Sequence, residues 1–254
     1  MIPLILAAQL LVSPPAETQP AGYEIIRRIP AVEATQAAAA DERSFYAISS
    51  TAVAEYDRHT GKRLRVVTAE GTQHLNSGFF WEGKLYCAHS HYPKQPDRSD
   101  IRVFDPQTGK LTIFHTFERS PGSLVWCVRR KQSWWCCFAH YGADNAKTVL
   151  VEYHGEFQEQ RRWTFPNEVV SEWDGMSASG GIWLEDTLLT SHHHDRVLYR
   201  LRLPQRGSVL ELVERRPGPF PGQGLAIDPV TGGLIGIDRA KREIVLARLC
   251  DLRK

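Results

Sequence analysis

Short strand-like runs of apolar residues dominate the chain, and clusters of turn residues separate them at regular intervals. No stretch after residue 40 keeps apolar residues at helical spacing for three turns. Strands rather than helices must then supply the core. The pattern therefore predicts an all-β protein.

Five of these runs end in a comparable way and recur with a nearly constant period. Their last residues are Asp57, Asp105, His154, Leu203 and Asp251, at spacings of 48, 49, 49 and 48 residues. A period near 48 residues that contains only short strands is typical of a β-propeller, in which each blade is a four-stranded sheet. The chain is expected to form five blades, or six if one of the repeats contains two blades.

The strands of each blade are lettered a to d from the axis outward. The last blade has only three strands in this assignment. The fifth blade lacks its d strand because the chain stops at Lys254, whereas the run YEIIRRI at residues 23–29 is extended and unassigned. A strand from the opposite end of the chain would close the ring and remove the exposed edges of an open sheet. We therefore expect a single propeller domain over residues 22–254, closed by an N-terminal outer strand.

The first residues carry a different pattern. Residues 2–12 form an apolar run of 11, too short to span a bilayer, and the polar, proline-rich segment SPPAETQPAG follows it. This order predicts a secretory signal peptide over residues 1–21, cleaved between about Ala16 and Ala21. The protein would then be secreted or periplasmic, without stable membrane insertion. A buried or frayed N-terminus is the alternative, because no Lys or Arg precedes the apolar run.

Composition argues against several classes of function. Hydrophobic residues make up 42% of the chain and charged residues 24%, and the net charge of +2 gives no basic excess for binding nucleic acid. No glycine-rich phosphate loop precedes a helix, which argues against a nucleotide cofactor. The serines of GMSASGG lack the strand–turn–helix setting of a nucleophile elbow, which argues against a serine hydrolase.

The cysteines leave two interpretations open. There are five, an odd number, and no CxxC pair that would indicate a cysteine zinc site. Cys127 and Cys136 flank the turn RRKQS and could oppose each other across a hairpin, which would permit a disulfide in an oxidising compartment. The cysteines could equally be small apolar fillers on buried strands.

Most of the histidines fall in loops on one face of the expected propeller. The loops that join strand d to the next strand a, and strand b to strand c, emerge together around the axis. Three histidines lie outside these loops, at His59, His115 and His154. The other seven lie within them or at the strand starts beside them, at His74, His89, His91, His140, His192, His193 and His194. The repeat therefore predicts a histidine cluster at one mouth of the axial channel.

Neutral imidazole is the commonest metal ligand in proteins, so this cluster is a candidate metal site. The preferred ligands are His74, His91, His140 and His194. Such a set, with no cysteine, suits zinc, iron, manganese or copper and leaves a coordination position open for water or substrate. The alternative is a polar channel in which the histidines hydrogen-bond to water and to one another.

Other residues in the same loops are candidates for catalysis and binding. An unligated His89 or His193 could act as a base, and Tyr92 or Tyr141 could act as an acid. The candidates for contacting a substrate are Gln36, Asn76, Gln223, Arg239 and Trp173, of which Trp173 would be a stacking platform. The other tryptophans lie on or beside expected strands, where they would pack between blades.

Four segments, HLNSGFFWEGKLYCAHSHYP, WWCCFAHYG, SGGIW and GQGLAID, resemble a group of exported bacterial propeller proteins, frequent in planctomycetes, that carry an automatic cycloisomerase label. The resemblance implies the propeller fold and export, and it implies no catalytic residue. Five-bladed glycosidases place carboxylates on their inner strands. The corresponding strand starts here carry Gln, His, Asn and Ser, which argues against that chemistry.

Together these observations predict an exported, metal-dependent lyase, isomerase or hydrolase that acts on a small oxygen-rich substrate such as a sugar derivative. The alternative is a propeller without catalytic activity that presents the same face to a glycan or a partner protein.

Overall fold

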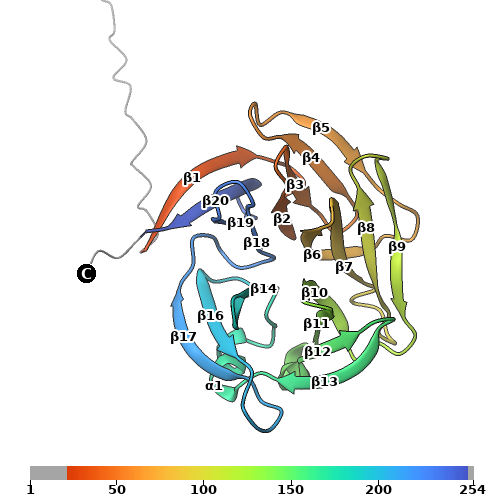
Figure 1. The fold of residues 1–254 in the computed structure, drawn as a ribbon, viewed down its shortest axis with the longest axis vertical. Helices are drawn as coiled ribbons and strands as arrows, with labels where there is room; N and C mark the ends of the chain where they lie inside the picture. The colour runs from red at the N-terminus through yellow and green to blue at the C-terminus, as the bar shows by residue number, and fades with distance from the viewer. Residues whose placement is uncertain (1–21, 251–254) are drawn as a thin grey trace, which may run out of the picture.

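The computed structural model describes residues 22–250, which form five four-stranded antiparallel sheets around a central axis (Figure 1). The first blade contains β2 (Ala37–Ala40), β3 (Ser44–Ile48), β4 (Val53–Asp57) and β5 (Arg63–Val67). The second contains β6 (His74–Trp81), β7 (Lys84–Ser90), β8 (Ser99–Asp105) and β9 (Lys110–Phe117). The five-bladed propeller expected from the sequence period is confirmed.

The next two blades repeat the same order. The third contains β10 (Ser123–Arg130), β11 (Ser133–Ala139), β12 (Val149–His154) and β13 (Gln158–Thr164). The fourth contains β14 (Gly180–Leu184), β15 (Thr187–Ser191), β16 (Val197–Arg202) and β17 (Glu211–Pro217). The helices of the described residues are short, namely η1 (Gly142–Lys147), α1 (Asn167–Val170) and η2 (Ser171–Trp173). Strands thus build the whole core.

Strands from both ends of the described chain form the fifth blade. Its inner strands are β18 (Ala226–Ile227), β19 (Leu234–Asp238) and β20 (Glu243–Leu249), and β1 (Tyr23–Pro30) pairs antiparallel with β20 as the outer strand. Figure 1 shows β1, at the red end of the chain, beside the blue β20. This pairing closes the ring as predicted.

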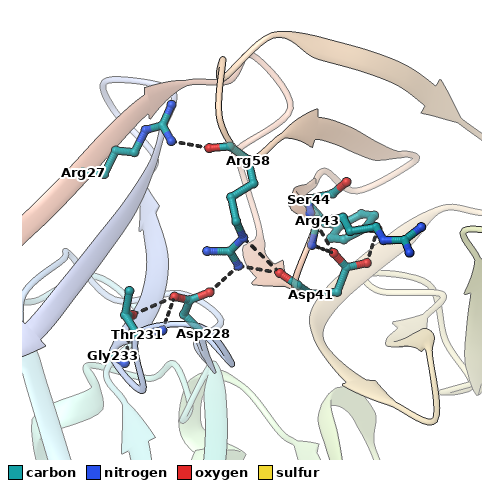
Figure 2. Close-up of polar contacts among 9 residues, drawn as sticks. Arg27, Asp41, Arg43, Ser44, Arg58, Asp228, Thr231 and Gly233 are labelled. Atoms are coloured by element: carbon teal, nitrogen blue, oxygen red, sulfur yellow. Dashed lines mark hydrogen bonds and ion pairs between the residues drawn. The ribbon is translucent and has the colours of Figure 1, made fainter.

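A buried ion pair joins the first blade to the fifth across this closure (Figure 2). The guanidinium of Arg58, which follows β4, pairs with the fully buried carboxylate of Asp228 and also donates to the backbone carbonyl of Asp41. Arg27 of β1 donates to the backbone carbonyl of Arg58. Thr231 donates its hydroxyl to Asp228 at 2.6 Å. The N-terminal strand and the two blades are thus tied together by one hydrogen-bonded cluster.

Burial by itself would raise the pKa of Asp228, but the hydrogen bonds from Arg58 and Thr231 outweigh it and hold the pKa below its usual value. Asp228 is therefore an anion at neutral pH. A buried charge of this kind is tolerated only when it is paired and hydrogen-bonded.

Large aromatic rings fill the space between blades, as expected for most of the tryptophans. Trp126 of β10 is fully buried and packs on Gly181 of β14 in the next blade. A Cβ atom at Gly181 would lie 2.6 Å from the indole ring, so only glycine allows this close approach. The other inter-blade tryptophans are buried or partly buried, namely Trp81, Trp134, Trp135, Trp163 and Trp183.

The cysteines are free thiols in the structure. Cys127 of β10 and Cys136 of β11 lie directly opposite each other, which is the hairpin register expected from the sequence. Both are buried, as are Cys87 and Cys137, and only Cys250 is exposed. Burial raises the pKa of the four buried thiols, which therefore stay neutral. They pack as small apolar side chains.

Within residues 22–250, no helix has the length and apolar character needed to cross a membrane. The predicted signal peptide, residues 1–21, lies outside the described residues.

Candidate functional site

A pocket of about 160 Å³ lies at the axis, and all five blades contribute to its lining. The residues come from the loops between strands d and a, from those between strands b and c, and from the starts of strand a. They are Gln36, His74, Asn76, Tyr92, Val125, Tyr141, Met176, Ser179, His193, Gln223 and Arg239. The structure therefore brings together eight of the residues selected from the sequence.

The first strand of each blade places the polar groups of the pocket. His74 is the first residue of β6, and the register of β6 against β7 shifts between Leu75 and Gly78, where Asn76 lies. Gln36 and Ser179 come immediately before β2 and β14. The starts of these innermost strands thus bring Gln36, His74, Asn76 and Ser179 to the same pocket.

Three of the residues that line the pocket have side-chain amides. Gln36 donates its NH₂ group to Ser50 Oγ at 3.0 Å, and Asn76 donates its NH₂ group to a backbone carbonyl of β10 at 3.0 Å. Gln223 donates to the backbone carbonyl of His193 at 2.8 Å. These bonds fix the orientation of each amide and leave its carbonyl oxygen free to accept a hydrogen bond from a ligand.

The two histidines of the pocket are neutral. Burial lowers the pKa of His193 to about 3, and the neighbouring side chains of His194 and Arg239 lower it further. Burial also lowers the pKa of His74. The Nδ1 atom of His193 lies 2.6 Å from the hydroxyl oxygen of Ser179, within hydrogen-bond distance. Both imidazoles therefore keep an unprotonated ring nitrogen that can accept a hydrogen bond at neutral pH.

Two tyrosines occupy equivalent positions in neighbouring blades. Tyr92 follows β7 and Tyr141 follows β11, and their rings lie 4.7 Å apart. The ring of Tyr92 also lies 5.4 Å from that of His74. Burial raises the pKa of Tyr141 and the neighbouring Tyr92 raises it further, so its hydroxyl stays protonated. Tyr141 is thus a hydrogen-bond donor or acid rather than a base.

Arg239 is the one charged side chain among the residues that line the pocket. It follows β19 and is exposed at the rim, whereas the amides, the tyrosines and the neutral histidines carry no charge. The pocket therefore has a net positive charge, and its guanidinium can form the two parallel hydrogen bonds that a carboxylate accepts.

A possible metal-binding group lies in the second blade, outside the axial pocket. The ligand atoms of His89, His91 and Asp100 lie within 4.8 Å of one another. It is the one group of three or more such residues found within residues 22–250. His91 and Asp100 also line a surface hollow of about 440 Å³. An imidazole pair with one carboxylate suits zinc, iron or manganese.

Hydrogen bonds already hold two members of this group. His89 Nδ1 lies 2.9 Å from one oxygen of Asp100, and His89 Nε2 accepts the backbone N–H of Gln73 at 3.0 Å. Arg102 donates to the other oxygen of Asp100 at 2.6 Å. His91 is half-buried. An ion could reach His91 and Asp100 directly, but ligation by His89 would replace one of its hydrogen bonds.

The four histidines preferred from the sequence are not brought to one point. His74 lines the axial pocket, whereas His91 belongs to the group with Asp100. His140 hydrogen-bonds through Nε2 to the carbonyl of Pro121 at 2.7 Å. His194 is exposed, with its ring 4.3 Å from that of His193.

Two other candidates from the sequence are buried outside the pocket, where they contribute to packing and loop structure. Trp173 is fully buried against Phe165, with ring centroids 5.0 Å apart, and does not line the pocket. His192 is buried and donates through Nε2 to the carbonyl of Glu172 at 3.0 Å, while its Nδ1 atom accepts the backbone N–H groups of His194 and Asp195. It fixes the HHHD loop.

The sequence argument set Ser179 aside, since the serines of GMSASGG lack a nucleophile elbow, and it missed Asp100. Ser179 lies at the start of strand a in the fourth blade, the same class of position that selected His74 in the second. Asp100 is the cross-strand partner of His89 in the pairing of β7 with β8. Extending the repeat argument to strand register would have selected Asp100.

No protein-family model and no curated protein matches the chain. Among solved structures, the chain is similar to the extracellular domain of a one-component system from B. thetaiotaomicron, with 12% sequence identity and a TM-score of 0.42. The similarity covers 78% of this chain and 24% of that one. The resemblance to exported cycloisomerase-like propellers stays a prediction.

Proposed function

We propose that the protein is an enzyme that acts on a small, oxygen-rich carboxylate bound in the axial pocket. One observation supports this above all: every blade contributes a polar group to a single small pocket, and Arg239 is its one charged side chain. Uncharged acceptors and donors surround that charge. A hydroxylated acid, of which sugar acids are examples, matches this arrangement.

Two kinds of group would bind the ligand: the charged side chain of Arg239 and the side-chain amides. The carboxylate of the ligand would pair with Arg239, an interaction worth about 1.5 to 3 kcal/mol when it is shielded from water. Hydroxyl groups of the ligand would donate to the amide oxygens of Gln36, Asn76 and Gln223, whose NH₂ groups are bound to protein acceptors. The pocket volume of about 160 Å³ restricts the ligand to a small molecule or the end of a longer one.

Proton transfer is the chemistry that the pocket residues can perform. His193 is neutral and can take up a proton, and Tyr141 keeps its proton and can donate one. A base and an acid on one small ligand serve a lyase, an isomerase or a hydrolase alike. His89, the other predicted base, is fully buried and bound to Asp100, outside the pocket.

A metal-dependent form of this function is the second candidate, and the grouping of His89, His91 and Asp100 favours it. These residues would hold the ion, which would supply Lewis-acid catalysis or an activated water. Metal analysis of protein purified without a histidine tag, before and after reconstitution, tests this candidate. Absence of stoichiometric zinc, iron, manganese and copper in both samples would refute it.

The same pocket could serve a binding protein with no catalytic activity. Turnover separates the two functions, because a binding protein returns the bound acid unchanged. We also propose that the protein acts outside the cytoplasm, which rests on the sequence of residues 1–21. Sequencing the N-terminus of mature protein from a secreting host would test cleavage near Ala21.

The binding step can be tested without knowing the substrate. A panel of hydroxylated carboxylic acids and the corresponding neutral alcohols would be screened by the increase in Tm on binding. We expect the acids to raise Tm and Arg239→Gln to abolish the increase. Arg206→Gln is the matched control, because Arg206 is exposed in the β16–β17 loop away from the pocket. Equal binding of acids and alcohols, or unchanged binding by Arg239→Gln, would overturn the proposal.

A further inference from the structure

We infer that Ser179 is a nucleophile activated by His193, and that the reaction in the axial pocket is acyl transfer from a carboxylate-bearing ester. The inference rests on the proposed function and names its reaction type. It stands on three features of the pair, namely its hydrogen-bond geometry, its rigid support and its position on the pocket wall.

The hydrogen-bond geometry suits general-base catalysis. Ser179 Oγ and His193 Nδ1 lie 2.6 Å apart, at the short end of the range for a nucleophile and its base. When Ser179 donates to Nδ1, the imidazole carries its own proton on Nε2 and has its lone pair directed at the serine hydroxyl. A neutral imidazole is the form required of a base.

Strand pairing and the neighbouring blade hold both residues in place. The backbone N–H of Ser179 donates to the carbonyl of Ser191 at 3.2 Å, which extends the β14–β15 ladder to the serine. The carbonyl of His193 accepts the side chain of Gln223 at 2.8 Å. Gly222 packs against the same carbonyl so closely that an added Cβ would lie 2.3 Å from its oxygen. The two reacting groups are therefore preorganised.

The pocket supplies the other parts that acyl transfer needs. Ser179 and His193 line it together with Arg239, which would anchor a carboxylate on the acyl portion of the ester. Burial is the main reason that the pKa of His193 is low, and pairing of Arg239 with that carboxylate would cancel part of the smaller contribution from Arg239. The protonated hydroxyl of Tyr141 lines the same pocket and can donate to the developing oxyanion.

The step balances with water as the only co-reactant. The oxygen of Ser179 attacks the ester carbon and forms a C–O bond, while its proton passes to His193 Nδ1. The bond to the leaving alkoxide breaks, and the alkoxide takes the proton from His193. Water then attacks the acyl-serine, again losing its proton to His193, and Ser179 recovers that proton when the free acid leaves.

A structural role for the same hydrogen bond would also hold the HHHD loop, so the test measures a covalent product. The full chain would be mixed with 4-nitrophenyl hydrogen fumarate, whose free trans carboxylate cannot reach its own ester carbonyl, and with neutral 4-nitrophenyl acetate. We expect a burst of nitrophenolate close to one equivalent of protein with the fumarate, and a fumaryl mass increment on the peptide that contains Ser179. After the hydrolysis of each ester without protein is subtracted, the acetate should react at least about tenfold more slowly.

Variants assign the roles. Ser179→Ala should lose the burst and the label, and His193→Gln should slow acylation by about 100-fold or more. Ser179→Cys restores a nucleophile at the same place and should form a thioester, which guards against a folding defect in the alanine variant. Ser171→Ala is the control, because Ser171 is an exposed serine outside the pocket.

The results separate the two proposals. Acids that bind in an Arg239-dependent way, with no burst and no label on Ser179, would overturn the nucleophile and leave the proposed ligand class standing. Acylation of another residue in the wild-type protein, or full acylation of the Ser179→Ala variant, would likewise overturn the assignment of Ser179 as the nucleophile. A label on Ser179 that forms equally with the neutral acetate would refute the ligand class instead.

Discussion

Replacing His193 by Gln should make the protein less sensitive to acid. The pKa of His193 lies at about 3 in the folded protein, below its ordinary value of 6.5, because burial, and to a smaller extent the neighbouring His194 and Arg239, disfavour the imidazolium. Between these values the unfolded chain binds a proton that the folded protein does not. This histidine therefore costs no stability above about pH 6.5 and an increasing amount as the pH falls.

The expected size follows from the linkage between proton binding and unfolding. At pH 5 the unfolded histidine is almost fully protonated, whereas His193 in the folded protein is still neutral. The separation of about 1.5 pH units from the unfolded pKa then corresponds to about 2 kcal/mol of lost stability. Gln cannot titrate, so the variant should be spared this loss. The variant also loses the hydrogen bond to Ser179. That loss lowers the free energy of unfolding by the same amount at every pH, so it does not change how the free energy of unfolding depends on pH.

Urea unfolding followed by tryptophan fluorescence, between about pH 8 and about pH 5, measures the effect. The difference in unfolding free energy between wild type and His193→Gln should shift by about 2 kcal/mol in favour of the variant over this range. His154→Gln is the control, since His154 is exposed at the end of β12 and does not line the pocket. Parallel pH curves for wild type and His193→Gln would mean that folded His193 accepts a proton, and would refute the reasoning.

Three further outcomes are expected. Arg58→Met leaves the carboxylate of Asp228 buried without its cation, so urea unfolding should show a loss of about 3 to 5 kcal/mol, and a loss below about 1 kcal/mol would contradict this. Gly181→Ala places a Cβ atom 2.6 Å from the indole of Trp126, and calorimetry should show a lower Tm and a loss of about 1 to 3 kcal/mol; an unchanged Tm would contradict it. His91→Ala should keep the fold and reduce bound zinc, measured by elemental analysis after reconstitution, from about one equivalent to near zero, whereas full retention would exclude His91 as a ligand.

The architecture was predictable because its signals are local and repeat along the chain. Strands that end in a comparable way recur every 48 or 49 residues, and each repeat is one blade. The closing strand was predictable by elimination, since the run at residues 23–29 had no other partner. Register is set by strand pairing rather than by spacing, which is why the pairing of His89 with Asp100 emerged only from the structure.

For the candidate site, the sequence could predict which loops contribute residues but not where their side chains point. The repeat predicts loop positions for His74, His140 and His194, and His74 lines the axial pocket, but the direction of a side chain depends on the bonds available nearby. His140 hydrogen-bonds to the carbonyl of Pro121, and His194 lies in solvent. The four-ligand set was inferred from loop membership alone, which says nothing of the distance between ring nitrogens.

The axial pocket also depends on closure of the ring. Gln36 belongs to the first blade, whereas Gln223 and Arg239 belong to the fifth, so the pocket spans the seam that β1 completes. The backbone joins the two sides directly, since the N–H of Gly224 donates to the carbonyl of Gln36 at 2.9 Å. A ligand that bridges Arg239 and Gln36 would hold the two blades together from the axis, while the pair of Arg58 with Asp228 holds them elsewhere on the seam. Binding and ring closure should therefore stabilise each other, because each orders groups that the other needs in place.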